Sequence, residues 1–195
     1  MSPPRTATMI SAALSALLAV GGCTEPQPLG PIEPTTTASA TPTQPSTPEP
    51  TDPTPPPLPA AAKPNTAKGA ARFVQHYIDL MNHASATGDV KPLQAKTSPE
   101  CQGCDNYIDL YRKTYANGGF FKDDGWEPGD PVAYLDGPTA TVLVDIDAPR
   151  TRFALKKGDQ IKVGEGGRYK LRIATAFRAG AWAVTELTEQ KALDR

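Results

Sequence analysis

Apolar residues recur at helical spacing in the first part of the chain that follows residue 65. Between Lys68 and Ala86 they form one stripe along a single face, which predicts an amphipathic helix. Gly88 is a stop signal for this helix, and Asp89 can cap a short helix that runs to Leu93. The stripe consists of Ala70, Phe73, Val74, Tyr77, Leu80, Met81 and Ala84.

A third helix is predicted to begin at Ser98-Pro99-Glu100. Serine is a good helix cap, proline suits the first helical position, and an acid is favoured near the positive end of the helix dipole. Asn117-Gly118-Gly119 ends the pattern. One face of this helix carries Cys101, Cys104, Tyr107, Ile108, Tyr111 and Tyr115.

After Gly119 the apolar period shortens to two, which predicts strands. Turn residues separate the strands into hairpins, and the stretch Phe120 to Asp130 receives no element. Helices followed by an antiparallel meander predict an α+β fold, with the N-terminal helices packed into a strongly curved antiparallel sheet. The expected strands are Val132–Leu135, Thr139–Ile146, Thr151–Leu155, Gln160–Val163, Arg168–Phe177 and Ala181–Leu187.

The first 23 residues have the pattern of an export signal. A short start with one positive charge precedes the apolar run Ala7–Val20, and Gly21-Gly22 leads into Cys23. The run is shorter than the roughly 20 apolar residues of a membrane-spanning helix. Val20-Gly21-Gly22-Cys23 resembles a bacterial lipobox, which implies that residues 1–22 are a lipoprotein signal peptide and that Cys23 is acylated. We therefore expect a lipid anchor on the extracytoplasmic face of the cell membrane, with an ordinary secreted protein or a simple membrane-anchored protein as the alternative.

Composition changes after the cysteine. Proline and threonine dominate residues 23–65, which favours a disordered stalk over a packed structure. Binding of a proline-recognition module and O-glycosylation are alternative uses of such a stretch. One α+β globular domain is then expected at 66–190, followed by a C-terminal tail at 191–195.

Charge gives little indication of a partner. The chain of 195 residues has 20 basic and 21 acidic residues, and removing the signal takes away one arginine and no acid. The basic residues form no patch of the kind that follows nucleic acid, so no nucleic-acid partner is expected.

Cys101 and Cys104 are the pair with the most evident chemistry. In an oxidising compartment a disulfide is expected, and a spacing of three on a helix brings the two Cα atoms within disulfide range. A redox-active pair near a helix N-terminus is the alternative. No second Cys/His pair stands at ligand spacing, so no metal and no cofactor is expected.

Other candidate residues have simpler interpretations. His76, Asp79 and His83 share a side of the first helix opposite its apolar stripe, which favours a solvated face. Asp145 and Asp147 are the nearest approach to an acid pair, and an outward polar face of a strand explains them. Gly164-Glu165-Gly166-Gly167 precedes a strand, unlike a phosphate-binding loop. Inward-pointing residues that either line a pocket or fill the core are Tyr77, Met81, Tyr107, Tyr111, Tyr115 and Trp182.

The domain resembles an uncharacterised family of actinobacterial surface lipoproteins. The resemblance rests on residues 71–89, which end in Ala-Thr-Gly-Asp, on Pro92-Leu93, and on 98–104 with its Cys-Gln-Gly-Cys. Members carry a domain of unknown function behind a lipobox and a proline-threonine stalk. The resemblance implies a cone-shaped fold similar to nuclear transport factor 2 (NTF2) and cystatin, and it implies no reaction.

These patterns favour a membrane-anchored bacterial surface lipoprotein that works as a non-catalytic binding or interaction module. Its partner is expected to be a small hydrophobic ligand or an envelope protein. A small-pocket enzyme of isomerase or hydrolase type is the alternative, and a thiol-disulfide redox protein is a further one. No catalytic residue is assigned.

Overall fold

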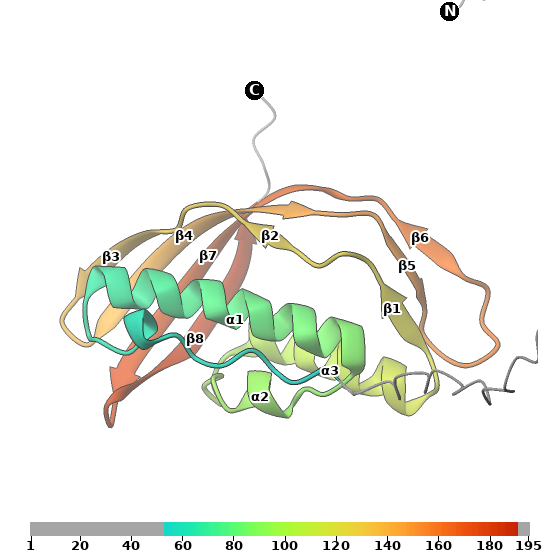
Figure 1. Ribbon diagram of the computed structural model, residues 1–195, viewed down its shortest axis with the longest axis horizontal. Helices are drawn as coiled ribbons and strands as arrows, with labels where there is room; N and C mark the ends of the chain where they lie inside the picture. Colours follow the sequence, from blue (N-terminus) through green and yellow to red (C-terminus); the bar gives the residue numbers. More distant parts are fainter. Residues whose placement is uncertain (1–52, 191–195) are drawn as a thin grey trace, which may run out of the picture. The chain divides into compact units, whose positions relative to one another are not determined.

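A computed structural model of the chain describes residues 53–190. In the described chain, a short 3-10 helix and three α-helices come first and eight strands follow (Figure 1). The helices pack against antiparallel sheets, so the predicted α+β class is confirmed. The helices are η1 (Ala60–Ala62), α1 (Ala67–Thr87), α2 (Lys91–Gln94) and α3 (Gln102–Ala116). The strands are β1 (Phe120–Lys122), β2 (Glu127–Pro128), β3 (Val132–Asp136), β4 (Thr139–Ala148), β5 (Thr151–Ala154), β6 (Lys162–Gly164), β7 (Gly167–Arg178) and β8 (Ala181–Gln190).

Helix α1 begins and ends where its sequence signals lie. The Thr66 side chain caps it by accepting a hydrogen bond from the Gly69 backbone N–H at 3.0 Å. At the other end Gly88 takes a left-handed conformation with φ 77°, and its N–H donates to the Ala84 carbonyl. The predicted limits of Lys68 and Ala86 therefore differ from the observed ones by one residue each.

Antiparallel pairing runs β3–β4–β7–β8 through two tight turns. Asp136 and Thr139 face each other at the first turn, where Gly137 has φ 54°. Arg178 and Ala181 face each other at the second, where Ala179 and Gly180 both have positive φ, as a two-residue hairpin loop of type I′ requires. All six strands expected from the alternating pattern are present.

The long β4–β7 hairpin continues past an interruption into a second sheet. Ala148 pairs with Gly167, and the next pair is Thr151 with Gly164, so Pro149 and Gly166 stand in the gap. A Cβ on Gly166 would overlap the Ala148 carbonyl oxygen, which explains the glycine. Beyond the gap, β5 and β6 form a three-stranded sheet with β1 and lie away from the long strands (Figure 1).

Strands β1 and β2 lie in the stretch that received no element from the sequence. β2 is two residues long and includes a proline, so it has no alternation to detect. β1 is held by its partners: the Phe121 ring stacks on Phe153 of β5 at a centroid distance of 5.8 Å, and its edge meets Tyr111 of α3. Both strands depend on tertiary contacts.

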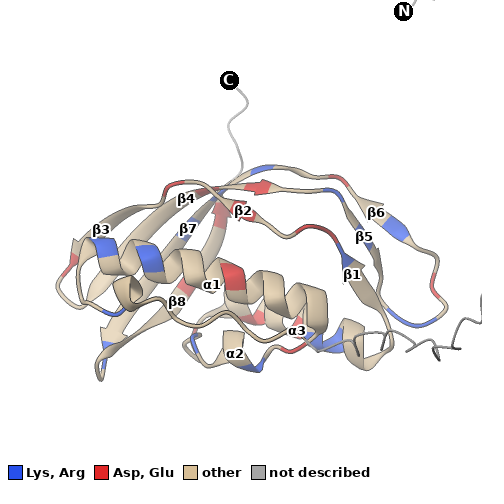
Figure 2. Cartoon of the chain, viewed as in Figure 1, with Lys and Arg blue, Asp and Glu red and all other residues tan. Residues whose placement is uncertain are grey.

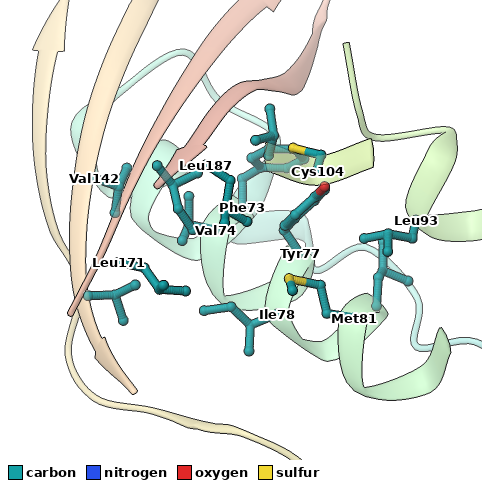
Figure 3. Packing of buried hydrophobic residues seen from close by; sticks show 14 of the residues in the cluster. Phe73, Val74, Tyr77, Ile78, Met81, Leu93, Cys104, Val142, Leu171 and Leu187 are labelled. Carbon is teal, nitrogen blue, oxygen red and sulfur yellow. The ribbon is translucent and has the colours of Figure 1, made fainter. Parts of the chain in front are cut away.

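The hydrophobic core lies between α1 and the inward side of the long strands. Alternate residues of β4 from Ala140 to Ala148 are buried, as are Leu171 and Ile173 of β7. In Figure 3, Phe73, Val74 and Tyr77 of α1 point into this layer, with Cys104 of α3 beside them. Among the described residues, the core cluster and its partly buried margin extend from Leu58 to Leu187.

The packed structure begins before the boundary at residue 65 that composition predicts. Ala62 is fully buried and Leu58 packs on the core, although both belong to the predicted stalk. The Trp182 indole N–H donates to the Pro64 carbonyl at 3.1 Å, which fixes this segment beside the β7–β8 turn. Proline lowers the entropy cost of docking an extended segment, an effect that average composition does not reveal.

Candidate functional site

The two cysteines at the start of α3 form a disulfide, as expected. Cys101 and Cys104 have Cα atoms 5.3 Å apart, and each residue is 1% exposed. The helix begins at Gln102, later than the predicted start at Ser98, because Ser98–Cys101 form a turn. The Cys101 sulfur caps the helix by accepting a hydrogen bond from the Cys104 N–H. Burial keeps both sulfurs from an attacking thiolate, so the geometry favours a structural role over redox exchange.

Gly103 lies between the two cysteines where α3 meets β8. A Cβ at this position would overlap the Leu187 carbonyl oxygen. Gly→Ala usually stabilises a helix by about 1 kcal/mol. Here the overlap should reverse the sign, and we expect Gly103→Ala to lower the free energy of unfolding by about 1–3 kcal/mol. Urea denaturation measures this. Gly129→Ala is the control, since its Cβ meets no atom closer than 3.5 Å; equal loss in both variants would contradict the close approach.

Tyr77, Met81 and Tyr111, predicted to line a pocket or fill the core, lie in the core with at most 6% exposed. The Tyr77 hydroxyl shares a hydrogen bond of 2.8 Å with the Thr97 hydroxyl. Burial raises the pKa of Tyr77 to about 12, against the lowering effect of that hydrogen bond. Burial also raises the pKa of Tyr111.

The raised phenol pKa predicts sensitivity to alkali. The folded state holds the Tyr77 proton up to about pH 12, whereas the unfolded chain releases it near pH 10. The contribution of Tyr77 to the free energy of unfolding therefore keeps its full value below pH 10. It should fall by about 2–3 kcal/mol between pH 10 and 12. Tyr77→Phe should make the decline in stability shallower by removing the contribution of Tyr77, while that of Tyr111 remains. Tyr134→Phe, at an exposed position, should leave the decline unchanged. Urea denaturation across this pH range measures both, and an unchanged decline in Tyr77→Phe would contradict the assignment.

Trp182, another predicted pocket residue, contacts a small surface hollow of about 190 Å³ near the β7–β8 turn. Its ring stacks on Phe73 and meets the edge of Phe177 at 5.0 Å. Because Trp182 itself is 4% exposed, most of the ring belongs to the core.

A second hollow, of about 220 Å³, lies at the bend between the two sheets. Tyr107, another predicted pocket residue, stands next to it: its ring meets Trp126 edge to face at 5.6 Å. Tyr115, the last of the predicted pocket residues, is half-buried, and its hydroxyl donates to the Ser85 carbonyl. Apolar and aromatic side chains form most of the wall of the hollow, and two carboxylates and two hydroxyls are also present in the lining. The lining residues are Trp126, Ala148, Pro149, Thr151, Gly164, Glu165, Tyr169, Leu171 and Glu189; we call this the bend hollow.

The two carboxylates of the bend hollow stand in different surroundings. Glu189 is exposed and lies opposite Leu171 in the β7–β8 register, on the inward side of the sheet. Burial, and then the charges of Glu189 and Tyr169, raise the pKa of Tyr107. Glu165 pairs with Arg150 at 3.1 Å, and both side chains are mostly exposed. The hollow thus combines an aromatic wall with negative charge at its mouth.

Asp145 and Asp147 point outward from β4, as predicted. Lys170 of β7 approaches Asp145 at 2.9 Å, and Arg168 approaches Asp147 at 3.8 Å. Arg172 of the same strand pairs with Glu186 of β8. The outer side of the long sheet therefore carries cross-strand ion pairs, which explain the two aspartates without catalysis.

The interpretation of the two histidines as a solvated face is wrong. His76 is 3% and His83 9% exposed, whereas Asp79 is exposed as predicted. Sheet, α2, α3 and η1 all pack on α1, so the side opposite the apolar stripe is largely covered. Burial lowers the pKa of His76, and Asp79 opposes that effect. His76 Nδ1 and His83 Nε2 are buried without a hydrogen-bond partner in the described part of the chain.

Cys23, the signal 1–22, most of the stalk and the tail 191–195 lie outside the described residues, so the structure does not test them. None of the described helices is long and apolar enough to span a membrane. Within residues 53–190, no three His, Cys, Asp or Glu side chains stand together as ligands for a metal ion.

The family called DUF6318, described as a family of unknown function, matches residues 38–188. The chain belongs to this family. No curated protein matches it. The family match confirms that the domain belongs to a family of unknown function, as the resemblance implied.

Solved structures similar to this DUF6318 chain include NTF2-like proteins, as the resemblance implied. One, from Cytophaga hutchinsonii, is 12% identical over 60% of this chain and 94% of its own, with a TM-score of 0.42. Another, from Salmonella enterica, is 13% identical over 64% and 92%, with a TM-score of 0.44. The intermembrane space region of chloroplast protein ARC6 is 13% identical over 64% and 95%, with a TM-score of 0.47. Similarity at this level carries no inference about function.

None of the predicted pocket residues lines the bend hollow of this DUF6318 chain. Among the lining residues that sequence reasoning missed are Trp126, Tyr169 and Glu189. Trp126 lies in the unassigned stretch, and its place depends on Asn82 of α1, whose amide bonds the Trp126 backbone at both N–H and carbonyl. A signal did exist for Tyr169, which is two residues before the inward Leu171 and therefore shares its face.

Proposed function

We propose that this chain is a lipoprotein held on the extracytoplasmic face of the cell membrane by acyl chains on Cys23. The support is the order of charged start, apolar run, two glycines and cysteine in residues 1–23. Each buried methylene contributes about 0.8 kcal/mol, so two chains hold stably where one is marginal. The domain then works as a non-catalytic binding module in the cell envelope.

The bend hollow is the observation that carries the binding role. Side chains of α1 fill the space under the long sheet, but beside Trp126 and Tyr169 a hollow of about 220 Å³ stays open. Its largely apolar wall favours a small hydrophobic ligand over an envelope protein as the partner.

A residue that fills the bend hollow should abolish binding of an apolar probe. Gly164 lines the hollow, and its Cβ would meet only ordinary contacts, the nearest at 3.7 Å from the Phe153 ring. Gly164→Leu should therefore place a side chain in the hollow without breaking the fold. We expect wild type to bind N-phenyl-1-naphthylamine and this variant to bind it at least tenfold more weakly, as measured by fluorescence titration.

Gly129→Leu is the matched control because its Cβ is equally free and lies outside the hollow. It should bind the probe as wild type does. Equal affinity in all three chains, or no binding by wild type, would contradict a ligand site at the bend.

A small-pocket enzyme of isomerase or hydrolase type is the second candidate, favoured by one observation. Glu189 lies in the bend hollow with Tyr169 and close enough to Tyr107 to affect its pKa. A general acid or base usually needs a carboxylate shielded from water, however, and Glu189 is exposed. Turnover of a p-nitrophenyl ester by wild type, and loss of that turnover in Glu189→Gln, would favour the enzyme over the binding module.

A further inference from the structure

One end of the described body carries cations, most of them without a carboxylate partner, next to exposed apolar residues. The hairpin tip between β5 and β6, with the neighbouring strand β1, forms this surface, which we call the tip surface. Figure 2 shows the basic residues of β1, β5 and β6 at this end. The β5–β6 register puts Arg152 and Val163 on one face of the short sheet and Lys162 on the other. The tip surface consists of Lys122, Arg152, Lys156, Lys157 and Lys162 together with Leu155, Ile161 and Val163.

The cations of the tip surface are arranged differently from those of the long sheet. On the long sheet each outward cation of β7 from Arg168 to Arg172 pairs with a carboxylate. On the short sheet Lys122 stands directly opposite Arg152 in register, and like charges so placed are unfavourable. Among the described residues, Lys122, Arg152, Lys157 and Lys162 have no carboxylate within 4.0 Å, and only Lys156 has one, Asp159 at 3.9 Å.

Nearby acids do not neutralise this surface. The Asp123 carboxylate accepts hydrogen bonds from the Gly125 N–H in its own loop and from the Thr151 hydroxyl of β5, and neither donor carries a charge. Asp123, Asp124 and Asp159 together are three acids against five cations. An anionic partner would relieve the repulsion between Lys122 and Arg152.

Three apolar side chains of the tip surface are exposed, as are Val132, Tyr134 and Leu135 of β3. Leu155, Ile161 and Val163 are 40%, 48% and 50% exposed. Val163 of β6 stands opposite Arg152, and Ile161 lies two residues before it, just ahead of the strand. Cations beside exposed apolar side chains match the interface of a bilayer, where headgroups are anionic and the layer beneath is apolar.

The described chain starts on the side of the body that is nearer to this end. In Figure 1, residues 53–59 run from η1 toward the end at which α1 finishes. A chain of 30 residues, the number from Cys23 to Pro53, spans at most about 100 Å when fully extended. A tether of that reach, joined on this side of the body, lets the tip surface meet the membrane that holds the anchor.

We propose that the tip surface docks on the anionic lipid headgroups of the membrane to which the chain is anchored. This inference rests on the proposed anchor for its biological setting, but the contact itself needs no acyl chain. Docking would hold the domain against the bilayer and would set the orientation of the bend hollow.

Vesicle binding tests the proposal on a chain from Thr24 to Arg195, which keeps the whole core. We expect co-sedimentation at low salt with vesicles of phosphatidylglycerol and phosphatidylcholine in equal parts, and none with phosphatidylcholine alone. Each cation near an anionic surface contributes roughly fivefold in affinity, so Arg152→Gln/Lys157→Gln should bind about 25-fold more weakly. Ile161→Ser/Val163→Ser should also bind more weakly, by losing the apolar contact.

Lys63→Gln/Lys68→Gln is the control, because it removes the same charge from exposed positions around the start of α1. It should bind within about twofold of wild type. The proposal is overturned by equal losses in both double glutamine variants, by no binding of wild type, or by equal binding to both kinds of vesicle. Competition by a soluble acidic peptide at stoichiometric concentration would also overturn it, in favour of a protein partner. Because this chain lacks Cys23, vesicle binding and acylation can fail independently.

Discussion

Cys23→Ser is expected to eliminate the mature acylated protein completely. A lipobox cysteine is modified on its thiol, and a serine hydroxyl, which stays protonated at neutral pH, does not replace that nucleophile. The wild-type chain should begin at Cys23 and carry the mass of its acyl chains. The serine variant should show no such species and should keep residues 1–22. Mass spectrometry of the N-terminal peptide measures both features.

Cys101→Ser/Cys104→Ser is the control for the loss of thiols elsewhere in the chain. In the wild-type chain these two sulfurs form a buried disulfide, away from the N-terminus. The double variant should therefore retain the acylated N-terminal peptide, although its protein stability should be lower. An unmodified Cys23 in wild type, or an N-terminus at another residue, would contradict the anchor.

Phe73→Ala is expected to destabilise the domain severely. Phe73 is 1% exposed, and its ring lies 6.5 Å from those of both Tyr77 and Trp182. Truncation removes buried apolar surface and leaves a cavity between α1 and the β7–β8 hairpin. The free energy of unfolding should fall by about 3–5 kcal/mol. That is comparable with the whole stability of a marginal domain, about 5 kcal/mol.

Urea denaturation measures the Phe73→Ala loss, with a lower midpoint at an unchanged slope. Tyr134→Ala on β3 is the matched control, because that aromatic side chain is 61% exposed. It should change stability by no more than about 0.5 kcal/mol. Similar losses in the two variants would mean that Phe73 does not fill the core as described.

The parts of the fold that the sequence predicts correctly are those with signals close by in the chain. The Thr66 cap, the apolar stripe and Gly88 act within α1, and the turn at Ala179-Gly180 acts within its hairpin. Such features are encoded near where they act, so the long helix and all six alternating strands were predictable. The two strands that were missed, β1 and β2, exist through partners more than fifteen residues away in the chain.

Long-range packing explains where sequence prediction was wrong or incomplete. Periodicity gives one apolar face of α1 but not the number of elements that cover the helix, so the burial of His76 and His83 was missed. The same limit applies to Leu58 and Ala62, which dock from a segment of stalk-like composition. The bend hollow needs both the interruption at Pro149 and the position of Trp126, and neither follows from a local pattern.

Acylation of Cys23 is tested most directly by metabolic labelling with an alkyne analogue of palmitate, followed by click detection. Cells expressing the wild-type chain should yield a labelled band of the mature size, and cells expressing Cys23→Ser should yield none. Equal label in the two chains, or no label in the wild type, would contradict a lipid anchor at this residue.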